Sequence, residues 1–311
     1  MFLLNLVFSN GGASLGHRHP ENSYRKMNKL PDNIATVVSA ALNEDIGTGD
    51  VSAALVSQQN PASAQVMCRE TAVICGTAWF EQSFFLIDKE TQIQWHVNDG
   101  DLVSAGQTLC HIQGNARALL SAERTALNFL QTLSATATVT HKYVQAIAGT
   151  ACKILDTRKT IPGLRSAQKY AVLCGGGCNH RMGLYDAILI KENHIVAAGS
   201  ITAAMQKARQ TSANLLLEVE IEQLEQIPEA IAAGAQRLLL DNMDPEQLRQ
   251  AVAITHRLTN MTEHKVELEA SGGVQLQQLR DLALTGVDYI SVGAITKHIH
   301  AVDLSMRFDF S

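Results

Sequence analysis

Three features are scarce or missing in this 311-residue sequence: long apolar runs, aromatic residues and regularly paired cysteines. No apolar run approaches the about 20 residues that a membrane-spanning helix needs, so we expect a soluble protein without a membrane partner. The opening MFLLNLVFSN has no cationic start and no cleavage site of small residues, so it does not predict an export signal. Residues 1–27 instead predict a loosely ordered extension, with Met27 as an alternative start to Met1.

The six cysteines follow no disulfide-type spacing, in a chain too large to need covalent cross-links. We therefore expect a reducing compartment and a cytoplasmic protein. Cys174, Cys178 and His180 lie close together in the sequence, but the usual zinc site has a second ligand pair at a distance, and none is present. These cysteines are interpreted as small apolar residues beside a glycine turn.

The second half of the chain repeats short apolar runs, each followed by a helix-like stretch. The runs cover residues 151–156, 187–191, 215–220, 237–241, 265–271 and 288–293. Their composition predicts buried parallel strands, and the alternation with helices predicts a closed α/β barrel or a doubly wound sheet. Catalytic residues of barrels lie where strands end. The strand ends here are Asp156, Lys191, Glu220, Asp241, Ser271 and Gly293.

The first half has a different pattern of predicted strands and helices. Residues 63–70, 91–97 and 107–114 predict strands, whereas residues 33–45 and 115–148 predict helices. This pattern favours a smaller α+β domain that packs on the barrel through the long second helix. No low-complexity linker separates the two parts.

Residues 156–194 gather six Arg and Lys residues against three acids, although the whole chain has a net charge of −5. Arg158, Lys159 and Lys191 follow strands, and His180 and Arg181 follow a triple-glycine turn. Arginine binds carboxylates through two parallel hydrogen bonds, so this cationic set suits a dicarboxylate or a pyrophosphate. We expect the neighbouring cations to lower the pKa of His180.

Two further cations of that segment have a simpler interpretation. Arg165 and Lys169 lie four residues apart, which predicts a solvated helix face. Arg124 lies on a polar position of the long helix, and the sequence alone favours a structural salt bridge with Glu123 or another neighbour.

Glycines and acids at the strand ends indicate a second kind of site. Ser271, Gly272 and Gly273 can point backbone N–H groups at a phosphate, although an ordinary strand-to-helix turn explains them too. Glu220 and Asp241 end neighbouring strands and suit ribose hydroxyls, Mg²⁺ or both, while capping of the following helices is an equal alternative. Glu218 is expected on the opposite side of its strand and is left out of the site.

Several segments, taken in order, resemble the bacterial quinolinate phosphoribosyltransferases, also called nicotinate-nucleotide pyrophosphorylases (carboxylating). These segments are SAERTALNFLQTLS, DTRKTIPGLRSAQKYAVLCGGGCNHRMGLYDAILIKENH, LEVE, LLLDN, EASGG and DYISVGAITKH. The resemblance extends from about residue 30 to about residue 307. It implies an N-terminal α/β sandwich domain over residues 28–135 and an incomplete parallel α/β barrel of the type II phosphoribosyltransferase kind over residues 136–296. Residues 297–311 would pack back toward the N-terminal domain.

The resemblance also implies a homodimer in which Arg124 enters the partner's active site, which replaces the salt-bridge interpretation. It assigns substrate contacts to thirteen residues. These are Arg124, Arg158, Lys159, Thr160, His180, Arg181, Lys191, Glu220, Asp241, Ser271, Gly272, Gly273 and Gly293. Among them Lys159, Lys191, Glu220 and Asp241 would be catalytic, and the two acids would hold Mg²⁺, mainly through substrate and water.

The implied reaction joins quinolinate to phosphoribosyl pyrophosphate and gives nicotinate mononucleotide, pyrophosphate and CO₂, a step of NAD biosynthesis. An alternative is a phosphoribosyltransferase of the same fold that acts on nicotinate or another aromatic acid. A nucleic-acid-binding module is a different class, and the negative net charge and the few aromatic residues argue against it.

Overall fold

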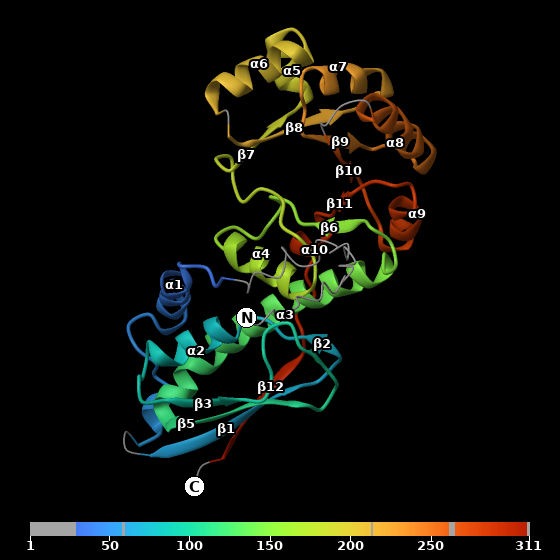
Figure 1. Cartoon of the computed structure of the whole chain (residues 1–311). Coiled ribbons are helices and arrows are strands. Elements are labelled where there is room, and N and C mark those ends of the chain that lie inside the picture. The colour runs from blue at the N-terminus through green and yellow to red at the C-terminus, as the bar shows by residue number, and fades with distance from the viewer. Residues whose placement is uncertain (1–28, 58–59, 213, 261–264, 310–311) are drawn as a thin grey trace, which may run out of the picture.

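The computed structural model describes residues 29–57, 60–212, 214–260 and 265–309 (Figure 1). The extension expected over residues 1–27 lies outside the described residues. The chain forms two parts, each with its own main sheet, and its last strand returns to the first part. No helix of the described residues combines the length and the apolar character needed to cross a membrane.

The first part is built on a four-stranded antiparallel sheet in the order β12-β1-β5-β3. Its strands are β1 (Pro61–Cys68), β3 (Gln92–Trp95), β5 (Thr108–Asn115) and β12 (Leu304–Asp309), beside a short pair, β2 (Ala72–Val73) and β4 (Leu102–Val103). Every second residue of β1 is buried, so one face of this sheet meets the helices. These helices are α1 (Ile34–Ile46), η1 (Ala53–Leu55), α2 (Thr77–Phe85) and α3 (Ala116–Ala146).

Helix α3 joins the two parts, as Figure 1 shows. It begins at Asn115, whose side chain accepts hydrogen bonds from the N–H groups of Arg117 and Ala118. Leu130 of this helix belongs to the apolar core of the first part, and Tyr143, further along, belongs to the core of the second part. One continuous helix therefore takes the place of a linker.

The second part is a six-stranded parallel sheet in the order β6-β11-β10-β9-β8-β7. Its strands are β6 (Lys153–Leu155), β7 (Ala187–Ile190), β8 (Leu216–Ile221), β9 (Arg237–Asp241), β10 (Glu267–Ser271) and β11 (Tyr289–Ser291). Strands β6 and β7 end this order without pairing to each other within the described residues. The barrel is therefore incomplete, and the predicted fold class is confirmed.

Helices follow the strands on the outside of this sheet (Figure 1). They are α4 (Arg165–Cys174), α5 (Glu192–Ala198), α6 (Ile201–Thr211), η2 (Leu224–Gln226), α7 (Ile227–Ala232), α8 (Pro245–Thr259), η3 (Leu276–Gln278), α9 (Leu279–Ala283) and α10 (Ala294–Lys297). Asp244 caps α8: its side chain accepts hydrogen bonds from the backbone N–H groups of Glu246 and Gln247.

The barrel strands alternate between an apolar face and a polar face, which corrects the interpretation of these segments as uniformly apolar runs. In β8, Leu217, Val219 and Ile221 belong to the apolar core beneath the helices. Glu218 and Glu220 lie between them and share the other face, because residues two apart in a strand point the same way. The expectation that Glu218 lies opposite Glu220 was therefore wrong.

Candidate active site

A cavity of about 860 Å³ lies at the C-terminal ends of the barrel strands. Eight of the predicted site residues line it: Lys159, Lys191, Glu220, Asp241, Ser271, Gly272, Gly273 and Gly293. Thr157, Asn242, Lys297 and His298 line it as well and were missed in the sequence. The cavity therefore combines lysines, carboxylates and glycine turns at one end of the sheet.

An ion pair crosses this cavity between two neighbouring strands. Lys191 directly follows β7, and its Nζ lies 3.0 Å from Oε2 of Glu220 near the end of β8. The Lys191 side chain is 51% exposed and the Glu220 side chain 12% exposed, so the lysine remains reachable from solvent. A negatively charged ligand can therefore approach the Lys191 ammonium group from the solvent side, while the ion pair with Glu220 keeps that ammonium group in place.

Asn242 organises the carboxylate beside it. Its φ of 55° lies in the left-handed region, which asparagine tolerates better than most residues. Its Nδ2 donates to Oδ2 of Asp241 at 2.6 Å, and its backbone N–H donates to the carbonyl of Ser271 at 2.9 Å. Asn242 thus fixes the Asp241 carboxylate and connects it to the glycine turn. The sequence signal was an asparagine directly after a strand-ending acid.

Two glycines allow the walls of the cavity to come close together. A Cβ on Gly272 would lie 2.2 Å from Oδ1 of Asn242, and the residue has a φ of 106°. A Cβ on Gly293 would lie 3.0 Å from Cδ of Lys159. Gly273 also has a positive φ, 50°, but open space surrounds its missing Cβ. The three glycines are thus constrained to different degrees.

Arg158 and Arg181 lie near each other on the loops between β6 and β7. Burial lowers the pKa of Arg181, and the positive charge of Arg158 lowers it further. Nε of Arg158 is buried and has no hydrogen-bond partner among the described residues. Nη1 of Arg181 donates to the carbonyl of Ala187 at 3.2 Å. Two like charges, one of them with a buried unused donor, form a site that an anion with two carboxylates would stabilise.

Arg165 and Lys169 are not a solvated helix face, so that interpretation was wrong. Lys169 is fully buried and forms an ion pair with Asp156, and its Nζ donates to the carbonyl of His180 at 2.8 Å. Arg165 donates to the Arg158 carbonyl at 3.3 Å. The helix face points toward the loops of the site because these loops offer a buried carboxylate and backbone carbonyls that accept hydrogen bonds.

The side chain of Thr160 lies in the same network. Its Oγ1 accepts a hydrogen bond from Nε of Arg165 at 3.1 Å, and the residue does not line the 860 Å³ cavity. Thr157, three residues earlier, does line it, and its Oγ1 accepts the Lys159 N–H at 3.0 Å.

His180 is turned into the barrel interior. Its Nε2 lies 3.1 Å from Oε2 of Glu218 and 3.6 Å from Oε2 of Glu269, and both acids are fully buried. The pKa of His180 is lowered, as expected, but burial is the largest cause, ahead of the nearby cations. Sequence analysis missed Glu269 and rejected Glu218, although both occupy positions on the inner faces of β10 and β8.

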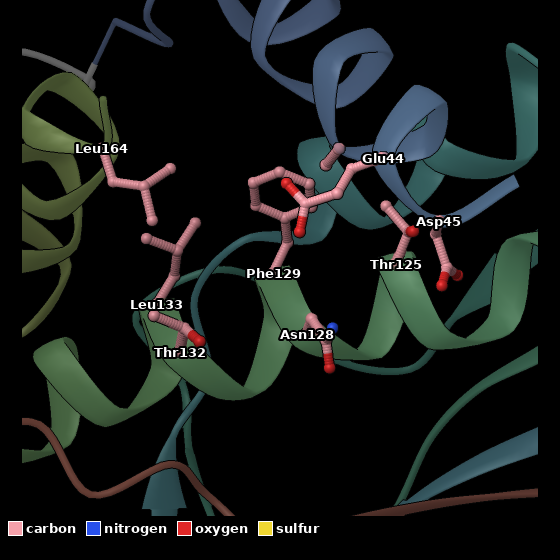
Figure 2. A pocket seen from close by; sticks show the side chains of 9 residues that line it. Glu44, Asp45, Thr125, Asn128, Phe129, Thr132, Leu133 and Leu164 are labelled. Atoms are coloured by element: carbon pink, nitrogen blue, oxygen red, sulfur yellow. The ribbon is translucent and has the colours of Figure 1, made fainter. Parts of the chain in front are cut away.

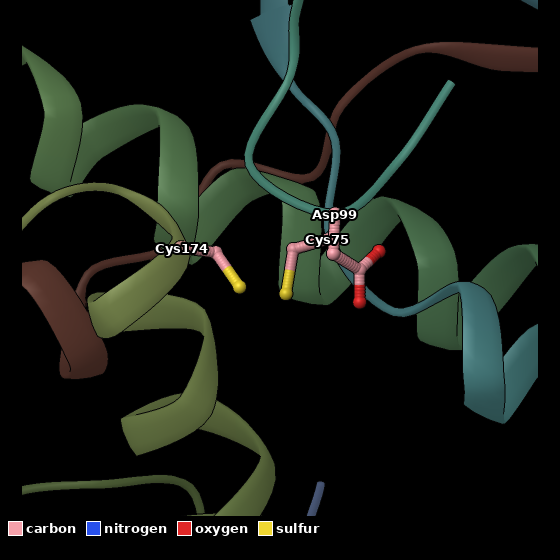
Figure 3. A group of neighbouring side chains, drawn as sticks. All are labelled: Cys75, Asp99 and Cys174. Carbon is pink, nitrogen blue, oxygen red and sulfur yellow. The ribbon is translucent and has the colours of Figure 1, made fainter. Parts of the chain in front are cut away.

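The cysteines near His180 have other neighbours. Cys174 faces Cys75 and Asp99 of the first part (Figure 3), and the ligand atoms of these three residues lie within 4.8 Å of one another. Oδ2 of Asp99 also accepts the hydroxyl of Tyr170 at 2.9 Å. Cys174 and His180 therefore lie in separate clusters, despite their closeness in the sequence.

Arg124 is exposed on α3 and does not line the large cavity. The salt bridge with Glu123 that the sequence alone favoured does not form in the described chain, although the arginine's charge acts on Glu123 and partly offsets the rise in its pKa from burial. Within one chain, Arg124 is therefore separate from the other cations of the predicted site.

Comparison with known proteins identifies the family. Two family models match the chain: "Quinolinate phosphoribosyl transferase, N-terminal domain" over residues 50–134 and "Quinolinate phosphoribosyl transferase, C-terminal domain" over residues 136–307. The chain belongs to the quinolinate phosphoribosyltransferase family. The two matches together span most of the described residues and cover both sheets.

Individual members of the quinolinate phosphoribosyltransferase family agree with this result. A probable nicotinate-nucleotide pyrophosphorylase (carboxylating) of Bacillus subtilis is 43% identical over 269 residues, which cover 86% of this chain and 91% of the relative. The solved nicotinate-nucleotide pyrophosphorylase of Francisella tularensis is 47% identical, with a TM-score of 0.86 over 91% of this chain and 98% of that structure. Human nicotinic acid phosphoribosyltransferase shares the fold alone, at 13% identity and a TM-score of 0.56.

Proposed function

We propose that this protein transfers the phosphoribosyl group of phosphoribosyl pyrophosphate to the ring nitrogen of quinolinate. The ring carboxylate next to the nitrogen then leaves as CO₂ and a proton takes its place, which gives nicotinate mononucleotide and pyrophosphate. This is the activity that the names of the close relatives imply for de novo NAD biosynthesis.

The observation that carries the proposal is the mixed chemistry of the 860 Å³ cavity. Its glycine turn at Ser271–Gly273 suits the 5′-phosphate, and Glu220 and Asp241 suit the ribose hydroxyls. Lys159 and Lys191 supply positive charge for the pyrophosphate. The Arg158 and Arg181 pair, on the adjoining loops, suits a base that carries two carboxylates.

Glu220 and Asp241 fit a magnesium ion that also binds the substrate. Carboxylate oxygens suit this hard cation, which usually keeps several waters and binds substrate phosphates. One oxygen of Glu220 is engaged by Lys191, and one oxygen of Asp241 is engaged by Asn242. Each carboxylate therefore has a second oxygen to offer. When bound, Mg²⁺ supplies positive charge that stabilises pyrophosphate as it leaves.

The chain's own residues supply position and charge for the rest of the reaction. As the bond to pyrophosphate breaks, positive charge develops on the ribose carbon, and the neighbouring carboxylates of Glu220 and Asp241 stabilise it. Lys159 and Lys191 stabilise the negative charge on the leaving group. After transfer, the ring nitrogen is cationic and accepts the electron pair that CO₂ leaves behind, so no further organic cofactor is required.

We propose that the working form is a homodimer in which Arg124 reaches the partner's site. Arg124 is exposed, and beside it α1 and α3 enclose a pocket of about 270 Å³ (Figure 2). Glu44, Asn128 and Thr132 give this pocket polar walls, while Phe129 and Leu133 give it an apolar base. A pocketed face of mixed character next to Arg124, which forms no ion pair within the described part of the chain, suits contact with a second copy.

The direct test incubates the purified protein with Mg²⁺, phosphoribosyl pyrophosphate and either quinolinate or nicotinate. We expect nucleotide and CO₂ from quinolinate and little nucleotide from nicotinate, because nicotinate has one carboxylate for the two arginines. Turnover of nicotinate without turnover of quinolinate would contradict the proposal and favour a phosphoribosyltransferase of the same fold that acts on nicotinate. A gel-shift assay at low salt covers the nucleic-acid class, for which we expect no retention.

A subunit-mixing experiment tests the shared site. Arg124→Ala and Lys159→Ala chains are each expected to be nearly inactive alone, and hybrids of the two regain one intact site. Mixing under conditions with verified subunit exchange should therefore restore part of the activity. No recovery despite exchange would count against a contribution of Arg124 across the dimer. We further propose a cytoplasmic enzyme, on the cysteine argument of the sequence.

A further inference from the structure

Two cysteines that the proposed chemistry does not use face each other where the two parts of the molecule meet (Figure 3). Cys75 lies in the loop before α2, and Cys174 is the last residue of α4. The two sulfur atoms lie within 4.8 Å of each other, and a hydrogen bond joins the two thiols. Neither sulfur is part of a disulfide in this structure. Each part of the molecule therefore contributes one thiol to a closely spaced pair.

The long helix α3 fixes the backbone beside each cysteine. The backbone N–H of Cys75 donates to Oγ of Ser134 on α3 at 3.0 Å, and the Ser134 hydroxyl donates to the Cys75 carbonyl at 3.2 Å. Gly175, directly after Cys174, packs so closely on α3 that a Cβ there would lie 2.4 Å from the carbonyl oxygen of Ala137. The two sulfurs therefore face each other from backbones that are both held in place.

Asp99 connects the two segments that carry the cysteines. Its Oδ1 accepts the backbone N–H groups of Gly76 and Thr77, just after Cys75, at 3.0 and 3.1 Å. Its Oδ2 accepts the hydroxyl of Tyr170 on α4 at 2.9 Å. One carboxylate thus bridges the loop and the helix, which keeps the two sulfurs close in the folded protein.

We propose that Cys75 and Cys174 are a redox-sensitive pair, which forms a reversible disulfide with a peroxide as oxidant and thereby weakens the binding of quinolinate. The bond itself goes beyond the proposed function, whereas its effect on quinolinate rests on that function. The reducing compartment that the sequence predicts fits this role, because disulfides that form in such compartments are usually transient and redox-sensing.

The bond forms in two balanced steps. Cys174 is partly exposed and Cys75 is fully buried, so hydrogen peroxide meets the Cys174 sulfur first. The O–O bond of the peroxide breaks, one oxygen forms a sulfenic acid on Cys174, and the other leaves as water. The Cys75 sulfur then attacks the Cys174 sulfur, the S–O bond breaks, and hydroxide leaves as a second water with the proton of the Cys75 thiol. The two thiols lose two hydrogen atoms, and the peroxide is reduced to two waters.

Helix α4 connects this pair to the candidate active site. Nζ of Lys169 on α4 donates to the His180 carbonyl at 2.8 Å. Arg165, on the same helix, donates to the Arg158 carbonyl at 3.3 Å. The sulfurs of a disulfide are about 2 Å apart, closer than two hydrogen-bonded thiols, so the bond pulls on the end of α4. We therefore expect it to displace the loops that carry Arg158 and Arg181, the pair that suits the two carboxylates of quinolinate.

A metal ion is the competing occupant, because Cys75, Asp99 and Cys174 offer three ligand atoms within 4.8 Å of one another. Metal binding requires thiolates. Burial, however, raises the pKa of Cys75 well above its ordinary value, and the hydrogen bond with Cys174 raises it further. Both oxygens of Asp99 already accept hydrogen bonds, and a structural zinc site has a fourth ligand. The geometry of the described residues therefore favours the disulfide.

The first test treats the reduced full-length protein with hydrogen peroxide, blocks the remaining thiols and maps disulfides by mass spectrometry of proteolytic peptides. We expect one peptide pair joined through Cys75 and Cys174, with two hydrogens fewer than the separate peptides. This readout requires neither a variant nor activity. A map without this pair would overturn the proposal. So would one equivalent of zinc that the untreated protein retains through dialysis and that Cys174→Ser does not.

Steady-state kinetics before and after oxidation test the consequence for the site. We expect oxidation to raise KM for quinolinate on the order of 10-fold, with KM for phosphoribosyl pyrophosphate nearly unchanged, and dithiothreitol to reverse the effect. Cys75→Ser and Cys174→Ser should each have the same kinetics with and without peroxide. The matched control is Cys178→Ser, four residues from Cys174 and also partly exposed, which should respond to peroxide like the wild type.

Two kinetic results would overturn the proposal. One is a mapped disulfide that leaves KM for quinolinate unchanged, and the other is a loss in Cys174→Ser as large as in the wild type. If the reduced wild type does not use quinolinate at all, the proposed function fails, and the peptide map still tests the disulfide.

Discussion

The two parts of the molecule use the inner faces of their strands in opposite ways. In the first part, Ala64 and Val66 of β1 pack against Leu119 and Leu130 of α3 in an apolar core. In the barrel, apolar residues face the outer helices, and the interior carries Glu218, Glu269 and Arg237 instead. Barrels are usually filled with branched apolar side chains. The first part thus buries apolar side chains on the inner face of its sheet, which stabilises the fold. The barrel interior instead buries charged side chains beside the candidate active site.

The largest expected effect comes from the buried ion pair beneath the site. Lys169→Met should lower the free energy of unfolding by about 3–5 kcal/mol, because it leaves the Asp156 carboxylate buried without its partner. Urea denaturation followed by circular dichroism measures it. The exposed Arg249→Met, which breaks a surface pair with Glu246, should cost less than about 1 kcal/mol.

A double variant separates the effect of an unpaired charge from the effect of lost packing. Asp156→Leu combined with Lys169→Met should recover much of the free energy of unfolding that Lys169→Met loses, since both charges are gone. Leu130→Ala should cost about 2–5 kcal/mol with little change in KM for either substrate. A Lys169→Met protein as stable as the wild type would contradict the view that the buried pair of Lys169 and Asp156 stabilises the barrel.

The next effect concerns activity rather than stability. Arg158→Ala and Arg181→Ala should each lower kcat/KM for quinolinate about 10- to 150-fold, or roughly 1.5–3 kcal/mol, because a charge-assisted hydrogen bond is lost. Steady-state kinetics with both substrates measures this loss. Unfolding free energies should change little, in contrast to Leu130→Ala. Turnover of quinolinate at the wild-type level in both variants would refute the assignment of the two arginines.

A smaller effect is the contribution of Glu269 to the pH dependence of stability. Its folded pKa, about 8, lies above the ordinary value of 4.5, so the folded state binds more protons between these values. The associated stability is present below pH 4.5 and is lost as the pH rises toward 8, on the order of 1 kcal/mol per pH unit. Glu269→Gln should remove this component when wild type and variant are compared by denaturation across that range. Parallel pH profiles would contradict it.

The smallest effect is expected at Gly273, where open space surrounds the missing Cβ and asparagine tolerates the positive φ. Gly273→Asn should change stability by less than about 0.5 kcal/mol. Gly272→Ala should cost about 1–3 kcal/mol and raise KM for phosphoribosyl pyrophosphate, because its Cβ would meet Asn242. Thermal unfolding and kinetics of the pair measure the difference. Equal effects at both positions would show that the turn, and not the contact with Asn242, limits substitution.

Much of the fold could be predicted, because local patterns carry it. The apolar run at residues 237–241 forms β9, and the apolar run at residues 187–191 forms β7. The strand-end rule also brought Lys191, Glu220, Asp241 and Ser271 to one cavity. Two other predictions were wrong. Glu218 was placed on the wrong face because the alternation of its strand was misapplied. Lys169 was placed on a solvated helix face because its buried partner, Asp156, is thirteen residues away in the chain.

The sequence by itself determined the order of strands and helices, the family and the residues at the strand ends, because these depend on periodicity and short motifs. Only the tertiary structure decided that His180 faces Glu218 and Glu269, that Cys174 faces Cys75, and that Arg124 is apart from the other cations. Such contacts join segments that are far apart in the chain. Their geometry follows from how sheets and helices pack, which no local pattern encodes.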